Sequence, residues 1–392
     1  RKITYKADKK LNVAKAELIA KAKAKREAAS KTIKYEDFIK RVKDVQNMKL
    51  PILKRLVRRN KAQLRLLRKN DKRRVEYLFR MADAYLQLEV IYKFKFGETV
   101  EALTTTKGPG RAKLVRRKAL YMKAKKKYLE QALAMLNDIS TNEAFQSWHR
   151  MDEVLFKLGD IARELGYQDI MKDKFQNLLS RYPTSQYVPN VYLAFAEFYF
   201  RKGRQGLNRA TKYYLKVIAS KKSRNTPIYY YARRMLGWCY FNLQRYQMAQ
   251  TNFLFVAQNA KRKALRSQAR NEVVMAYAYR GNRSLAFNFF QHQLGAKYAK
   301  PLYLKLAQEY FAQGNMANMI WVYNDLIRRF PKDPARCEWM RQVYLGYNLD
   351  QLVEKMANTL EQLVTTMGDL KKQYGEKKMQ YRVYRDFSRS AL

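Results

Sequence analysis

Side chains that commonly carry out catalysis or bind metals are scarce in this sequence of 392 residues. His149 and His292 are the only histidines, and neither stands in a zinc-ligand or catalytic-triad arrangement. The segment 107–110 contains glycine and proline but lacks the Gly-Lys-Ser/Thr ending of a phosphate-binding loop. We therefore predict no catalytic residue, no metal site and no cofactor, and we expect a protein that is not an enzyme.

The two cysteines offer little further chemistry. Cys239 lies inside the apolar run 235–241, where a thiol behaves as a small buried hydrophobe. Cys337 follows a proline-containing turn. A disulfide between the two stays open at this point.

Hydrogen bonding along a groove is the chemistry that the sequence favours. Seven polar residues recur near the small residue of a repeated helix and form the predicted partner groove: Asp160, Arg163, Asn190, Glu197, Arg234, Asn271 and Gln308. Such a row of amides, guanidiniums and carboxylates can bind an extended peptide backbone, while neighbouring Tyr and Phe rings take its side chains. The alternative is that these are ordinary solvated positions.

A repeated pair of helices must position these residues. A small residue, a turn and a second amphipathic run recur five times between Met151 and Pro334, and in the last four copies an aromatic residue stands three positions after the small one. The residues at the small position are Gly159, Ala196, Gly237, Val274 and Ala307, spaced by 37, 41, 37 and 33 residues. The aromatic residues expected in the second helices are Phe175, Tyr214, Phe253, Phe290 and Tyr323.

The residue types explain how such a unit folds. A small side chain lets two helices of a hairpin approach closely, and an aromatic ring fills the space beneath it. One hairpin cannot bury its apolar face alone, so neighbouring hairpins stack. The sequence predicts an all-α fold, a right-handed α-α superhelix with a concave groove.

Four segments carry a resemblance to a known family: 76–85, 145–159, 182–192 and 232–243. The period and residue order are similar to those of the tetratricopeptide repeat (TPR). Within that family the chain resembles envelope TPR proteins of Gram-negative bacteria, of the myxobacterial gliding-motility type. The TolA-binding coordinator and the lipoprotein of the barrel-assembly machine are more distant matches.

The composition along the chain predicts five regions. The ranges are a basic helical extension over 1–74, a divergent first hairpin with an inserted loop over 75–149, five repeats over 150–334, capping helices over 335–370, and a basic tail over 371–392. Pro51 is expected to separate two short amphipathic segments within the extension. An apolar stripe over 352–370 predicts either a cap on the last repeat or a coiled coil.

The chain carries a formal net charge of +48, and the excess is concentrated near its start. Residues 1–130 hold 40 Lys and Arg against 13 Asp and Glu. Ten residues form the predicted basic patch: Arg58, Arg59, Arg73, Arg74, Arg116, Arg117, Lys118, Lys125, Lys126 and Lys127. A surface of this kind attracts polyanions.

Two functions follow as hypotheses. The first is a scaffold or adaptor that binds partner proteins through the groove within a multiprotein envelope or motility assembly. The second is a module that binds a polyanion through the basic N-terminal third, with an acidic protein or anionic envelope polymer favoured over nucleic acid.

The resemblance implies a periplasmic or outer-membrane-associated location, with a cytoplasmic one as the alternative. The sequence contains no stretch of eighteen uncharged apolar residues, so we predict no transmembrane helix.

Overall fold

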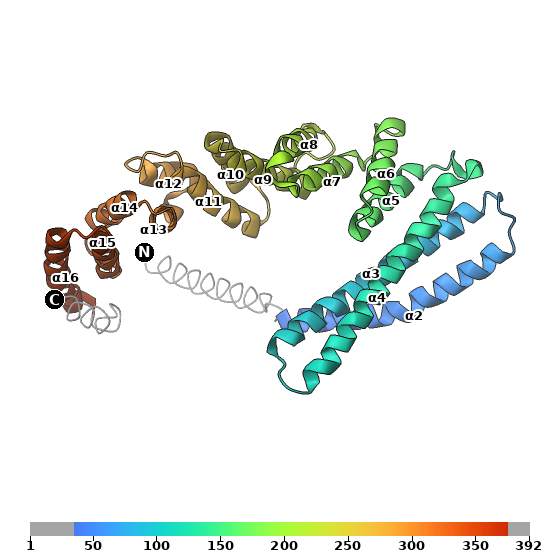
Figure 1. Cartoon of the computed structure of the whole chain (residues 1–392), viewed down its shortest axis with the longest axis horizontal. Coiled ribbons are helices and arrows are strands. Elements are labelled where there is room, and N and C mark those ends of the chain that lie inside the picture. The colour runs from blue at the N-terminus through green and yellow to red at the C-terminus, as the bar shows by residue number, and fades with distance from the viewer. Residues whose placement is uncertain (1–34, 375–392) are drawn as a thin grey trace, which may run out of the picture. The chain divides into compact units, whose positions relative to one another are not determined.

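The computed structural model describes residues 35–374, and every regular element in that range is helical (Figure 1). The chain is an all-α helical-repeat solenoid, so the predicted fold class is confirmed. It divides into two compact units, Arg1–Tyr182 and Pro183–Leu392. Residues 1–34 of the predicted helical extension and residues 375–392 of the predicted basic tail lie outside the described residues.

The first unit combines three long helices with one shorter hairpin (Figure 1). Its elements are α2 (Tyr35–Arg65), α3 (Arg74–Thr105), α4 (Gly110–Thr141), the 3-10 turn η1 (Glu143–Phe145), α5 (Met151–Leu165) and α6 (Gln168–Arg181). Helix α3 packs against both α2 and α4, and α5 packs against α4 and α6. The core includes Phe79, Leu88 and Leu136, all with almost no exposed surface.

The prediction of a break at Pro51 is wrong, because α2 runs through this residue without interruption. Proline removes one backbone donor from a helix, at a cost of about 3 kcal/mol in a helix interior. Here Pro51 is exposed, while Leu50, Leu53 and Val57 on the other side of α2 pack into the core of the unit. Burial of that apolar side keeps the helix continuous.

The second unit is a run of short helices (Figure 1). They are α7 (Val188–Phe200), η2 (Gly203–Gln205), α8 (Leu207–Ala219), α9 (Pro227–Asn242), α10 (Tyr246–Asn259), α11 (Lys263–Ala278), α12 (Ala286–Leu294), α13 (Ala296–Ala312), α14 (Met316–Arg329), α15 (Arg336–Leu349) and α16 (Val353–Tyr374). Each of the pairs α7 with α8, α9 with α10 and α13 with α14 packs together, and α9 also contacts α7.

The five expected repeats coincide with the helix pairs α5–α6, α7–α8, α9–α10, α11–α12 and α13–α14. All five aromatic residues of the second helices are buried. The fourth pair departs from the others, since Val274 stands at the small position and α12 has only nine residues. The close ring contact at this pair is local to the end of α11, where a Cβ atom on Gly281 would lie 2.1 Å from the ring of Tyr277, four residues earlier.

Helix α16 places its apolar stripe on α15. Leu360, Leu363, Met367 and Leu370 are buried in one cluster with Met340 of α15. This packing is that of a cap on the helix array. The predicted domain ranges stay predictions, because a repeat array has no unique internal boundary.

Both cysteines are fully buried and reduced. Cys239 lies in α9 and Cys337 in α15, in different apolar clusters. Burial raises the pKa of the Cys239 thiol to about 12 and that of the Cys337 thiol to about 11. The prediction of a buried Cys239 is confirmed.

Candidate partner-binding groove

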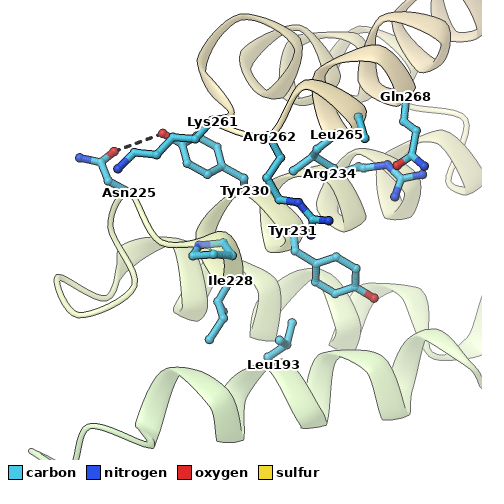
Figure 2. Close-up of a pocket in the computed structure, with 12 residues that line it drawn as sticks. Leu193, Asn225, Ile228, Tyr230, Tyr231, Arg234, Lys261, Arg262, Leu265 and Gln268 are labelled. Atoms are coloured by element: carbon cyan, nitrogen blue, oxygen red, sulfur yellow. Dashed lines mark hydrogen bonds between the residues drawn. The ribbon is translucent and has the colours of Figure 1, made fainter. Parts of the chain in front are cut away.

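A pocket of about 500 Å³ lies in the second unit where the first helices of three successive repeats come together (Figure 2). Leu193 of α7 and Ile228 of α9 face it from one side, and Leu265 of α11 faces it from the other. Tyr230 and Tyr231 add ring surface. An apolar concavity of this size, with a few polar groups at its edge, is the usual form of a binding site.

The loops that precede α9 and α11 shape one end of this pocket. Asn225 adopts a positive φ of 60°, and its Oδ1 accepts a hydrogen bond of 3.4 Å from the Tyr230 hydroxyl (Figure 2). Thr226 then caps α9, because its hydroxyl oxygen accepts a bond from the Tyr229 amide. Pro227 follows at the first helical position, where its missing N–H costs nothing.

The pocket has a positive electrostatic character. Lys261 and Arg262, in the loop before α11, are exposed, and no ion pair holds either one within residues 35–374. In Figure 2, Arg262 points toward Tyr231, while Lys261 points toward Asn225. The first residues of α9 and α11 also line the pocket, and helix N-termini favour negative charge. The site therefore suits an apolar group that carries a carboxylate beside it.

Arg234, the third cation at the pocket, is held by a neighbouring repeat. Its Nε donates to both carboxylate oxygens of Glu272 on α11, at 2.8 and 2.9 Å. The Trp238 Nε1 donates to the same carboxylate at 3.0 Å. Glu272 is only 6% exposed, so this network joins α9 to α11 in a largely dry environment.

Glu197 makes the equivalent connection one repeat earlier. Its carboxylate accepts a hydrogen bond of 3.1 Å from the Tyr231 hydroxyl, which joins α7 to α9. Burial and the nearby Glu197 carboxylate raise the pKa of the Tyr231 hydroxyl. Two of the seven predicted groove residues, Glu197 and Arg234, thus hold adjacent repeats together beside the pocket.

The other predicted groove residues are more dispersed. Asp160 and Arg163 lie in the first unit and pair with each other across one helical turn, at 2.6 Å between Arg163 Nη2 and Asp160 Oδ1. Asn190 is half-buried at the start of α7. Asn271 on α11 and Gln308 on α13 are exposed. Only Arg234 of the seven lines the pocket itself.

Sequence reasoning missed most of the residues that line the pocket. Tyr231 and Gln268 occupy the position six residues before the small residue of their repeats, as Asn190 does in the second repeat. Leu193 stands three residues before Ala196, as Arg234 stands before Gly237. Positions three and six residues before the small residue of each repeat would therefore have predicted Leu193, Tyr231 and Gln268 as lining residues. The predicted groove contains polar residues only, whereas the pocket is lined largely by apolar ones.

The predicted basic patch divides into exposed and paired residues, all in the first unit. Arg58 and Arg59 on α2 are exposed, as are Arg116, Arg117, Lys118, Lys126 and Lys127 on α4. Arg73 pairs with Asp71, and the side-chain hydrogen bond from Arg73 lowers the pKa of that carboxyl to about 2. Arg74 donates to the carbonyls of Leu64 and Leu67.

Lys125 belongs to a mixed cluster between α3, α4 and α5. Its Nζ lies 2.8 Å from Glu164 and 3.9 Å from Glu89, and Lys93 also pairs with Glu164. Burial is the largest influence that raises the pKa of the Glu89 carboxyl, followed by the Glu164 charge. Burial acts in the same sense on Glu164, but hydrogen bonds from Lys125 and Lys93 outweigh it and lower the pKa.

The histidines sit apart from any such cluster. His149 is exposed in the turn before α5, and His292 is exposed in the last turn of α12. Residues 35–374 contain no group of three or more His, Cys, Asp or Glu side chains arranged to hold a metal ion. None of the helices described is both long and apolar enough to cross a bilayer.

Comparison with known proteins places one tetratricopeptide repeat in this chain, at residues 153–185. That match covers α5 and α6, the first of the five helix pairs. The repeat fold suggests protein partners. No curated protein matches the sequence.

Two solved structures are similar at low levels. One is BtubC (BKLC) from P. vanneervenii, with 13% identity, a TM-score of 0.28, and coverage of 62% of this chain and 92% of that one. The other is a Rap protein complexed with Competence and Sporulation Factor, with 13% identity, a TM-score of 0.30, and coverage of 84% and 99%. At TM-scores this low, neither structure says what this chain binds.

Proposed function

We propose that this protein is a non-enzymatic adaptor that captures an extended segment of a partner protein along the first helices of its repeats. The observation that carries the proposal is the pocket formed by α7, α9 and α11. An apolar side chain of the segment enters between Leu193, Ile228 and Leu265, and an adjacent carboxylate meets Lys261 and Arg262.

One ion pair and one hydrogen bond beside the pocket support this function by keeping the pocket preformed. The Arg234–Glu272 and Tyr231–Glu197 contacts fix the distances between consecutive first helices. A pocket that is rigid before binding loses less conformational entropy when a ligand enters. The partner therefore gains affinity without ordering the adaptor.

The setting of this function is a finer proposal. The resemblance to Gram-negative envelope proteins supports a role in a multiprotein envelope or motility assembly, in the periplasm or at the outer membrane. A cytoplasmic assembly is the alternative. Fractionation of the native source cells tests the compartment, and recovery in the cytoplasmic fraction would contradict the envelope proposal.

Crosslinking mass spectrometry of the native assembly tests the adaptor function. Amine-reactive crosslinks from Lys261 and Lys263, at the entrance to α11, should join this chain to another protein. Lys305, on α13, provides an internal comparison away from the pocket. Partner crosslinks that avoid 261 and 263 and come only from the first unit would count against the groove.

A second candidate function rests on α4. Between Gly110 and Leu129 this helix carries nine Lys and Arg and no Asp or Glu. Such a segment supports binding to an acidic protein or anionic polymer, and less specifically to nucleic acid. Binding of this kind weakens steeply as salt rises, because counterions compete for the cations. Salt-insensitive association of the first unit with its partner would exclude it.

A further inference from the structure

Helix α2 presents a second apolar stripe to solvent, on a side other than the one that packs in the core. Its members are Val45, Met48, Ile52 and Leu56, which are 44%, 62%, 65% and 37% exposed. Their spacing of three, four and four residues aligns them along one side of a helix. Four large apolar side chains in such a row are more than the scattered exposure normal for a soluble surface.

The exposure of this stripe is enforced by packing on the other side of α2. Leu53 is buried, and Leu50, Val57 and Leu64 pack with it in the core of the first unit. The Lys43–Glu98 ion pair adds a further contact to α3. We call the exposed row Val45, Met48, Ile52 and Leu56 the outer stripe. A rotation of α2 that buried the outer stripe would expose the apolar residues that now pack in the core, so the outer stripe stays in contact with solvent.

Cations border the outer stripe along its length. Lys49, Arg55 and Arg59 lie at helical spacing beside Val45, Ile52 and Leu56, and no ion pair holds any of these three cations within residues 35–374. The sequence from Val45 to Arg65 contains no acidic residue. An apolar stripe with basic edges is the pattern of a helix that lies in a membrane interface.

The terminal segments of this protein carry a net positive charge, like the edges of the outer stripe, and repulsion between like charges disfavours binding of these segments to the stripe. Residues 1–34 contain 12 Lys and Arg against three Asp and Glu, and residues 375–392 contain five against two. A second copy would bring the same cations to face one another. The occupant is therefore a separate anionic partner.

Two observations favour a lipid surface over other anions. Helix α4 of the same unit carries nine cations and no acid over 110–129, and seven of them belong to no ion pair within residues 35–374, because only Lys125 and Lys126 are paired. Such a number of unpaired cations suits an extended anionic surface better than a single acidic helix. Nucleic acid would meet the cations, but its phosphate backbone would leave Met48 and Ile52 in water. A bilayer accepts both the cations and the apolar side chains.

We propose that α2 binds an anionic lipid bilayer, with Val45, Met48, Ile52 and Leu56 inserted at the headgroup boundary and Lys49, Arg55 and Arg59 on the lipid phosphates. This surface on α2 is independent of the groove in the second unit. Loss of lipid binding would leave partner capture by the groove intact, and loss of partner capture would leave lipid binding intact.

Vesicle co-sedimentation of the full chain tests the proposal. Vesicles of phosphatidylcholine with about 30% phosphatidylglycerol should bind the protein far more tightly than phosphatidylcholine alone. Combined Lys49→Gln, Arg55→Gln and Arg59→Gln should weaken binding about a hundredfold, at roughly a factor of five for each cation near the surface. Combined Met48→Ser and Ile52→Ser should weaken it about tenfold or more.

Matched variants in the second unit serve as controls. Arg204→Gln, Lys221→Gln and Arg224→Gln remove the same charge from exposed positions, and Met248→Ser with Leu285→Ser removes comparable exposed apolar surface. Both sets should bind as the unaltered chain does. Helical content by circular dichroism confirms that each variant is folded.

A dye measurement separates insertion from simple adsorption. Met48→Cys labelled with an environment-sensitive fluorophore should shift to the blue with anionic vesicles and stay unchanged with duplex DNA. Equal binding to neutral vesicles, an apolar variant that binds at full strength, or an unshifted dye would each overturn the proposal. Capture of an acidic helical peptide, with the same losses and no vesicle binding, would assign the surface to a protein instead.

Discussion

The Phe175 ring lies against the bare backbone of Gly159, and a Cβ atom built on Gly159 would be 2.3 Å from the ring Cε1. Gly237 and Phe253 repeat this relationship two helix pairs later, at 2.5 Å. The ring of the second helix thus occupies the space that a side chain on the first helix would need. In both pairs, glycine sets how closely the two helices approach.

Gly159→Ala and Gly237→Ala should therefore destabilise the protein. Overpacking of a well-packed core costs about 1–3 kcal/mol, and that penalty exceeds the higher helix propensity of alanine. Thermal unfolding followed by circular dichroism should show a lower midpoint for each variant. Gly97→Ala is the matched control, because no atom outside the backbone of its own helix lies within 4 Å of its Cβ position, and it should leave the midpoint unchanged or raise it. Equal midpoints for all three variants would contradict the packing argument.

Removal of Arg234 should leave a buried charge without its partner. Arg234→Gln removes three hydrogen bonds from Glu272 and leaves the one from Trp238. The desolvation of this carboxylate then costs about 2–3 kcal/mol. Arg234→Gln combined with Glu272→Gln should be less destabilised than the sum of the two single variants. A double-mutant cycle by chemical denaturation measures this coupling, and strict additivity would show that the pair contributes nothing.

Neutralising Glu89 should stabilise the first unit at neutral pH. The pKa of the Glu89 carboxyl is raised in the folded protein. At a pH above this raised pKa the carboxyl is ionised in both states, and its burial lowers the free energy of unfolding. At a pH below the ordinary carboxyl pKa of about 4.3 it is protonated in both states, and the cost disappears. Glu89→Gln should raise the thermal midpoint at pH 7, and the difference should vanish near pH 4. Glu130→Gln, at an exposed position on α4, is the control and should change neither midpoint.

Reversing the charge at the pocket entrance should weaken partner capture without unfolding the chain. Lys261→Glu with Arg262→Glu places two carboxylates beside the expected partner carboxylate, so affinity should fall by at least tenfold at moderate salt. Pull-down of partners identified by crosslinking, at several salt concentrations, measures the loss. Arg204→Glu with Lys212→Glu is a control of equal charge change, at exposed positions of η2 and α8 that do not line the pocket. Undiminished capture by the pocket variant would exclude the pocket as the binding site.

Replacement of Leu193 by Asp tests the apolar part of the same pocket. The side chain is half-buried, so the aspartate can reach solvent in the free protein but opposes entry of an apolar group. Capture should be lost while helical content stays constant. Asn190→Ala with Asn271→Ala provides the companion test of the predicted polar row. Arg234 is omitted from this companion variant because its loss also weakens the repeat contact.

The repeat fold could be predicted because its signals are local. The spacing of the small residues and of the aromatic residues predicted helices where α5 to α14 lie, and the contacts of Gly159 and Gly237 supply the physical reason in two of the pairs. The continuous helix through Pro51 could not be predicted in this way. The side chains that hold α2 together contact α3, which is distant in sequence, and tertiary packing overrode the local preference.

The candidate site was less accessible to sequence reasoning. Polar residues on the first helices were recognised, but their partners belong to the next repeat, 34 to 38 residues away. Arg234 therefore looks available in the sequence, although Glu272 holds it in the structure. To predict such pairs, one must know how far the first helix of one repeat is shifted along the first helix of the next, as well as the residue spacing within each helix.

The two buried thiols also make this chain convenient for spectroscopy. Because Cys239 and Cys337 have no exposed surface and ionise only at strongly alkaline pH, maleimide reagents at neutral pH would leave both unmodified. One cysteine introduced at an exposed site would then be the sole reactive position, without prior removal of native residues. Pairs of such labels within the second unit would let electron paramagnetic resonance or single-molecule fluorescence measure the distances between its repeats.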